Sequence, residues 1–132
     1  MAAKTVLGGI AVTALVGGTL VAGAPAHADD SKVRTGDCTR TATYRMALAD
    51  LDRDDQDRLR AVFAVNGPRA NARWSVTFKR NGQVVHRAAK RANDRGNVTF
   101  ASTFRGDDDA WVKVIARSGY GERCARRLTL DD

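Results

Sequence analysis

Apolar and polar residues alternate with a period of two in short runs along most of this 132-residue chain. In the first run Tyr44, Met46 and Leu48 fall on one side, while Thr43 and Arg45 fall on the other. A period of two is typical of a strand with one buried face. Seven runs are predicted as strands: residues 41–49, 59–65, 73–79, 83–86, 98–102, 111–117 and 123–130. Seven short strands separated by turn signals predict an all-β fold, a single β-sandwich.

Local signals around these runs refine the prediction. Asn81-Gly82 lies between two runs, which is a strong signal for a two-residue hairpin. Two stretches also fit a helix by composition: residues 56–65, and residues 86–95, which are rich in Ala, Arg and Lys. Gly96 and the period-two pattern favour strands, but strand and helix both remain open for residues 86–95.

The first 28 residues have the composition of a secretory signal peptide. Lys4 carries the one early charge, residues 5–23 are uncharged and mainly apolar, and Ala26-x-Ala28 has the small residues of a cleavage site. A membrane anchor is the alternative, but the run is rich in Gly and ends in Pro25. We therefore expect residues 1–28 to be removed and the product to be secreted. The remainder is expected to be a flexible segment over 29–36 and a domain over 37–132.

Composition after cleavage agrees with a small extracellular β-domain. The expected product has 104 residues (132 less 28) and a net charge of +6, because Lys4 leaves with the signal. The full chain has 14 Asp and one Glu, and Asp favours turns whereas Glu favours helix interiors. An even cysteine count in an exported chain predicts a Cys38–Cys124 disulfide. A catalytic or metal-binding cysteine pair would need further partners, which the sequence does not offer nearby.

Trp74 lies in the third predicted strand. This position resembles that of the core Trp of immunoglobulin-like domains. The sixth predicted strand resembles their Asp-x-Gly-x-Tyr-x-Cys-x-Ala run, and reads Asp108-x-Ala110-x-Val112-x-Val114-x-Ala116. Val112 replaces the Tyr and Val114 the Cys, so the disulfide of that family cannot form, and Cys38–Cys124 would instead tie the first strand region to the last. The chain also resembles small secreted actinobacterial sandwich proteins, mostly of unassigned function. The resemblance implies an immunoglobulin-like fold and leaves function open.

Strand order predicts that acidic residues gather at one end of the sandwich. Alternating strand directions place loops 50–57, 80–83 and 105–109 together. Calcium binds clusters of carboxylate oxygens, so this end is a possible calcium site. Its candidate ligands are Asp50, Asp52, Asp54, Asp107, Asp108 and Asp109. Asp is also an ordinary turn residue, and an EF-hand is excluded because Asp55 and Ala61 occupy the positions of its required Gly and Glu. No other cofactor is indicated.

The opposite end, formed by loops 66–73, 91–96 and 118–122, is predicted to be basic. Its candidate ligand-binding residues are Arg69, Arg73, Arg95, Arg123 and an exposed Tyr120, with Trp111 added if it is exposed on its strand. Arg binds phosphate bidentately and Tyr stacks on bases or sugars, so an anionic polymer is a candidate partner. A generally charged, soluble surface is the alternative. The integrin-type tripeptide at 105–107 is expected by chance in a chain of this composition.

No arrangement of residues indicates catalysis. His86 is the only histidine after residue 28, no serine lies in a Gly-x-Ser-x-Gly turn, and no cluster has zinc spacing. We therefore expect a secreted, monomeric binding module and not an enzyme, with an envelope or anionic polymer or a protein as its ligand. A secreted inhibitor and a small-molecule carrier are the alternatives.

Overall fold

The computed structural model describes residues 28–51 and 57–131. The predicted signal peptide lies outside these ranges, apart from Ala28. The described chain forms eight strands and no helix: β2 (Ala28–Asp37), β3 (Thr43–Leu51), β4 (Arg58–Asn66), β5 (Arg73–Arg80), β6 (Gln83–Arg91), β7 (Asn97–Arg105), β8 (Trp111–Ser118) and β9 (Arg123–Thr129). The all-β prediction is confirmed, with one strand more than expected.

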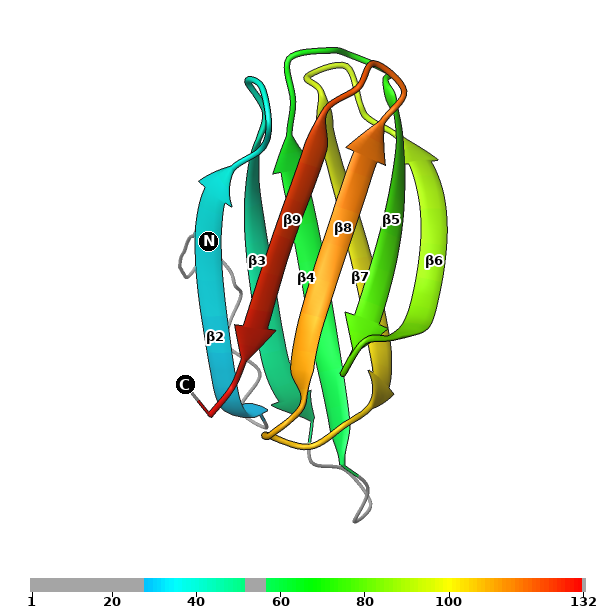
Figure 1. Ribbon diagram of the computed structural model, residues 1–132. Helices are drawn as coiled ribbons and strands as arrows, with labels where there is room; N and C mark the ends of the chain where they lie inside the picture. Colours follow the sequence, from blue (N-terminus) through cyan, green and yellow to red (C-terminus); the bar gives the residue numbers. More distant parts are fainter. Residues whose placement is uncertain (1–27, 52–56, 132) are drawn as a thin grey trace, which may run out of the picture.

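The strands form two antiparallel sheets that pack face to face (Figure 1). The first sheet has the order β2-β3-β4-β7 and the second sheet the order β6-β5-β8-β9. Alternate residues of each strand point inward, and these side chains form one hydrophobic core. Its largest fully buried members are Trp74, Phe63, Phe78, Phe100 and Met46.

The strand pairing is that of an immunoglobulin-like sandwich. Counted from β3, the second strand (β4) pairs with the fifth (β7), and the third (β5) pairs with the sixth (β8). The sixth also pairs with the seventh (β9). These are the B–E, C–F and F–G pairs of the immunoglobulin fold. Trp74 is fully buried on β5, as the resemblance implies, and Val112 and Val114 fill the core from β8.

The expectation of a flexible segment over residues 29–36 does not match the structure, because these residues lie in β2. The strand pairs with β3 at one edge of the first sheet. Lys32 and Arg34 face inward opposite core residues of β3, so no apolar alternation is visible in the sequence. Backbone hydrogen bonds hold the strand, and Lys32 Nζ donates to the Thr129 carbonyl across the sandwich at 2.6 Å.

The two stretches that also fitted a helix are strands. Residues 58–66 form β4, whose buried positions alternate as expected. Residues 83–91 form β6, an edge strand on which exposure is high and alternation is weak. The predicted hairpin is confirmed: Asn81 and Gly82 have φ angles of 50° and 87°, as a type I′ turn requires.

The predicted disulfide is confirmed and joins Cys38, just after β2, to Cys124 in β9. It therefore links the first sheet to the second across 86 residues of sequence. Within the two described ranges, no helix is long and apolar enough to cross a membrane.

Candidate functional site

The loops gather at the two ends of the sandwich as the strand order predicts (Figure 1). At the upper end of that view, the Gly67 amide donates to the Gly96 carbonyl at 2.9 Å and joins two loops. At the lower end, the Gly106 amide donates to the Asp57 carbonyl at 3.1 Å. Each end therefore presents a continuous surface made from separate loops.

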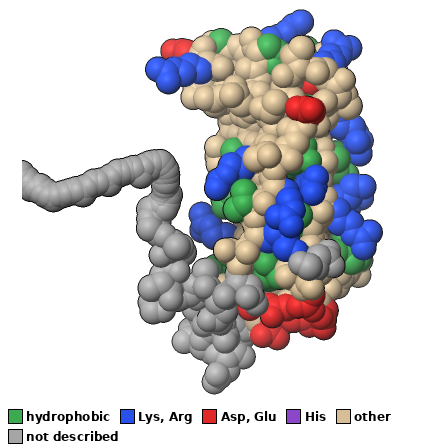
Figure 2. Space-filling model, turned by 90° about the vertical axis from the view of Figure 1, so that its left-hand side faces the viewer, with side chains coloured by type: hydrophobic (Ala, Val, Ile, Leu, Met, Phe, Trp, Pro, Cys, Tyr) green, Lys and Arg blue, Asp and Glu red, His purple; other side chains and the backbone are tan. Residues whose placement is uncertain are grey.

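Most acidic side chains visible in Figure 2 lie at the lower end. Asp107 caps the turn before β8, because its side chain accepts the Asp109 amide at 3.1 Å and its carbonyl accepts the Ala110 amide. Asp50 lies half-exposed near the end of β3, and Asp108 is half-exposed in the same turn region as Asp107. The other calcium candidates, Asp52 and Asp54, lie outside the described residues. Over 28–51 and 57–131, no three His, Cys, Asp or Glu residues are grouped to hold a metal ion.

At the upper end, Tyr120 is packed into the sandwich and not exposed as we expected. Its ring meets Trp74 edge-on, with centroids 6.0 Å apart, and the Arg69 guanidinium covers the ring at 4.5 Å. The Tyr120 hydroxyl is buried, like Trp74 Nε1, and neither atom has a hydrogen-bond partner among the described residues. Burial and the Glu122 carboxylate raise the pKa of the Tyr120 hydroxyl, although Arg69 partly lowers it. Tyr120 is therefore half-buried, and the Arg69 guanidinium already lies over its ring, where a ligand would stack.

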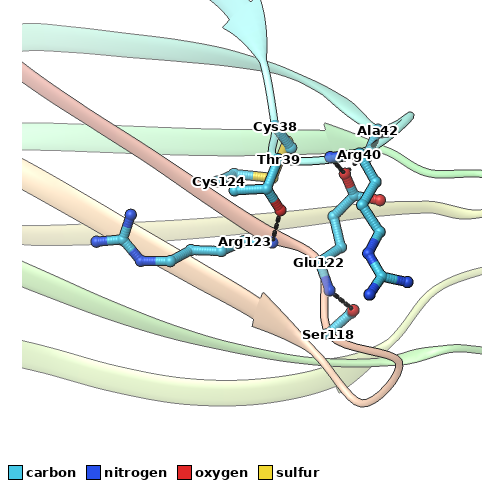
Figure 3. Close-up of a disulfide and its surroundings, with 8 residues drawn as sticks. All are labelled: Cys38, Thr39, Arg40, Ala42, Ser118, Glu122, Arg123 and Cys124. Atoms are coloured by element: carbon cyan, nitrogen blue, oxygen red, sulfur yellow. Dashed lines mark hydrogen bonds between the residues drawn. A yellow bond between two sulfur atoms is a disulfide. The ribbon is translucent and has the colours of Figure 1, made fainter.

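Glu122, the only glutamate, holds the loop between β2 and β3 in place (Figure 3). Its Oε2 accepts the backbone amides of Arg40 at 2.5 Å and Ala42 at 3.2 Å. Its own amide donates to the Ser118 hydroxyl at 2.9 Å. Glu122 is 1% exposed and lies two residues from the disulfide, so the covalent bond and the carboxylate hold the same loop. Sequence reasoning missed this role, although a lone Glu among many Asp residues was a visible signal.

The outward face of the second sheet carries only basic charges. Residues that point outward alternate with core residues along each strand, and residues paired across neighbouring strands point to the same side. The strand pairing therefore identifies the outward residues of all four strands. They place eight Arg and Lys side chains on one surface, called the basic face below: Arg73 and Lys79 of β5, Arg87 and Arg91 of β6, Lys113 and Arg117 of β8, and Arg123 and Arg127 of β9. All eight are exposed or half-exposed, and no Asp or Glu occupies any position of these four strands.

The register sets like charges directly opposite one another on the basic face. Arg73 pairs with Arg91, and Arg117 pairs with Arg123. Nearer the lower end, three basic residues on neighbouring strands form a row across β5, β8 and β9: Lys79, Lys113 and Arg127. Like charges at directly opposed positions destabilise a sheet. None of the eight makes an ion pair with another described residue. Arg91 Nη1 donates to the Asn71 carbonyl at 3.2 Å and the Arg127 guanidinium lies over the Trp111 ring, but neither contact supplies a full negative charge.

Trp111 lies on the same outward face as the row of three. It is half-buried, and the Arg127 guanidinium lies 4.2 Å from its ring centroid. The Asn81 side chain accepts the Trp111 amide at 3.0 Å and ties the ring to the adjacent hairpin. This settles the question left open in the sequence: Trp111 faces away from the core, at the lower margin of the basic face.

The outward face of the first sheet carries fewer basic side chains, and the two in mid-sheet have no like charge directly opposite. Near the lower end of this face, Arg58 pairs with Arg105. Arg45 lies between Thr35 and Ala64, and Arg60 lies between Ala49 and Thr103. Both arginines are exposed. The two faces of one small protein therefore differ in how basic side chains are arranged, and Arg45 and Arg60 offer a control for the basic face.

The predicted basic-end residues are divided by the structure. Arg73 and Arg123 belong to the basic face, whereas Arg69 and Arg95 lie in the upper loops. Basic side chains are also spread along the body of the sandwich and are not confined to one end (Figure 2). Arg91, which the sequence placed in the basic loop 91–96, also belongs to the face. The sequence prediction missed the other five members: Lys79, Arg87, Lys113, Arg117 and Arg127. Sorting charges by strand face, instead of by loop, would have found them.

No protein-family model, curated protein or solved structure matches the chain.

Proposed function

We propose that this protein is a secreted, non-catalytic module that binds an anionic polymer through the basic face. The observation that carries the proposal is the set of eight outward-facing cations on one sheet, none in an ion pair with another described residue and seven of them directly opposite a like charge. A bound polyanion would turn this unfavourable arrangement into a favourable one. Sequences tend to depart from local stability rules at functional sites. Seven of the eight cations of the basic face lie directly opposite a like charge, whereas the described pairs on the outward face of the first sheet include one such case, Arg58 and Arg105.

The chemistry of the face suits anionic groups along a chain. Six of the eight residues are arginine, whose planar fork binds phosphate or carboxylate through two parallel hydrogen bonds. A polymer also releases counterions when several of its charges are neutralised together, so affinity rises with the number of contacts and falls with salt. An extended sheet face presents many such contacts at once.

Binding of labelled inorganic polyphosphate, measured by fluorescence anisotropy at several salt concentrations, tests this proposal. The face variant Arg117→Gln/Arg123→Gln removes two adjacent charges of the basic face. The control variant Arg45→Gln/Arg60→Gln removes the same charge from the first sheet. Charge-assisted hydrogen bonds contribute about 1.5–3 kcal/mol each, so we expect the face variant to bind at least about tenfold more weakly at low salt.

The control variant is expected to bind within about threefold of the parent, because it loses only distant charge. The dependence of log affinity on log salt should also become shallower in the face variant, by about 0.7 for each lost contact. Equal weakening in both variants would show that only net charge matters, and the proposal would then be wrong.

A further inference from the structure

The eight cations of the basic face fall into two bands, and each of the four strands contributes one residue to each band. The upper band is formed by Arg73, Arg91, Arg117 and Arg123. The lower band is formed by Lys79, Arg87, Lys113 and Arg127. The bands lie four residues apart on β6, β8 and β9, which corresponds to roughly 14 Å at the rise of an antiparallel strand.

An uncharged strip separates the two bands. It is formed by outward residues with shorter side chains: Ser75, Thr77, Ala89, Ile115 and Ala125. The pairing makes the strip continuous, because Ser75 lies opposite Ala89, Thr77 opposite Ile115, and Ile115 opposite Ala125. The strip therefore runs diagonally across all four strands, from β6 to β9.

We infer that the bound polymer is a single flexible phosphodiester chain lying along this strip, contacted by one band on each side. The inference rests on the proposed function and adds the path and the ligand class. Arg and Lys side chains extend several ångströms from the sheet, so a backbone on the strip lies within reach of both bands. Arg91 and Arg127 would exchange their present contacts, with the Asn71 carbonyl and the Trp111 ring, for contacts with the polymer. The hydroxyls of Ser75 and Thr77 lie on the strip and can donate to phosphate or sugar oxygens.

The dimensions favour one chain over a duplex. A width of roughly 14 Å accepts a single backbone with basic side chains on both flanks. A rigid duplex is too wide to enter, and would touch only the tips of the bands. Four strands spaced about 4.8 Å apart cover a path of at least about 14 Å. At one charge per 3.4 Å or more, a path of about 14 Å holds at most about four phosphates, so a salt slope no steeper than about −3 is expected for a single strand.

Filling the strip without changing any charge tests the path. Thr77→Trp places a large side chain at the centre of the strip and keeps all eight cations. Ala64→Trp is the matched control, because Ala64 is a half-buried outward residue on β4, the central strand of the first sheet. Binding of a short, labelled, single-stranded abasic oligonucleotide, which has no bases to stack on an introduced ring, is measured for each variant after the melting temperature confirms folding. We expect Thr77→Trp to bind at least tenfold more weakly, and Ala64→Trp to bind like the parent.

Ala125→Tyr fills the strip from the edge strand β9 and serves if Thr77→Trp does not fold. If both filled variants bind like the parent while Arg117→Gln/Arg123→Gln does not, the path is wrong and the proposed function stands. If the face variant also binds like the parent, both proposals fail. A DNA duplex that binds as tightly per phosphate as the single strand would overturn the single-chain inference.

Discussion

Loss of the Cys38–Cys124 disulfide should strongly destabilise the domain. The bond closes a loop of 86 residues in the unfolded chain. The chain-entropy relation for that length gives about 15 cal/mol/K, which is about 4.6 kcal/mol at 25 °C. For a domain of this size the unfolding entropy near the midpoint is about 0.2 kcal/mol/K. The melting temperature should therefore fall by about 20 °C.

Calorimetry of the oxidised protein, the reduced protein and the Cys38→Ala/Cys124→Ala variant measures this change. The reduced protein and the variant should agree, since both remove the same constraint. Once the bond is lost, the loop after β2 is still held by the Glu122 carboxylate on the Arg40 and Ala42 amides and by two hydrogen bonds between Thr39 and Arg123. The decrease in unfolding free energy caused by Glu122→Ala should therefore differ between the protein with the disulfide and the protein without it. The reason is that the effects of changes at neighbouring sites do not simply add. A fall of less than 5 °C on reduction would refute the reasoning.

Three further predictions test other parts of the account. Gly96 has φ +84°, and an added Cβ would overlap a backbone carbonyl, so Gly96→Ala should lower the free energy of unfolding by about 2 kcal/mol or more in urea titration. A Cβ added at Gly119 would make only an ordinary van der Waals contact, so Gly119→Ala should change the free energy of unfolding by less than about 0.5 kcal/mol. Lys113 has a like charge opposite it on both sides, so Lys113→Gln should raise stability by about 0.5 kcal/mol at low salt, while Arg45→Gln should not. High salt should remove this gain, and an unchanged gain in high salt would contradict the electrostatic explanation.

The third prediction concerns the pH dependence of stability, because the pKa of Tyr120 is raised in the folded protein. The unfolded chain loses this proton first as pH rises, so the contribution of Tyr120 to stability is complete below the ordinary tyrosine pKa of about 10 and is lost above it. Urea titrations from neutral to alkaline pH should show a steeper loss of stability in the parent than in Tyr120→Phe. Equal slopes would mean that Tyr120 is not the group responsible.

The sequence predicted most of the sandwich because buried residues alternate visibly on its central strands. β3, β4, β5 and β8 show clean alternation, and the Asn81-Gly82 turn and the disulfide were also confirmed. The edge strands were harder to predict. In β2, the charged residues Lys32 and Arg34 occupy inward-facing positions where apolar residues would be expected. β6 is exposed along most of its length. Edge strands are defined by backbone pairing with a neighbour, which a single sequence does not display.

The candidate site was only partly predictable for a related reason. Charges were assigned to loops, because loops often carry binding residues. The basic face instead depends on register: Lys113 and Arg127 become neighbours only when β8 and β9 pair as they do. Tyr120 was expected to be exposed on its turn, but Trp74 and Arg69 enclose its ring. Such contacts between distant parts of the chain require the folded arrangement.

The most direct test of the basic face is a two-dimensional amide NMR titration of the isotope-labelled domain with inorganic polyphosphate. The account predicts that shift changes concentrate on β5, β6, β8 and β9, and are largest around the uncharged strip at Thr77 and Ile115. Shift changes should be small on β3 and β4, around the isolated Arg45 and Arg60. Changes centred on the first sheet or on the upper loops around Arg69 and Arg95, or spread evenly over the molecule, would contradict the account.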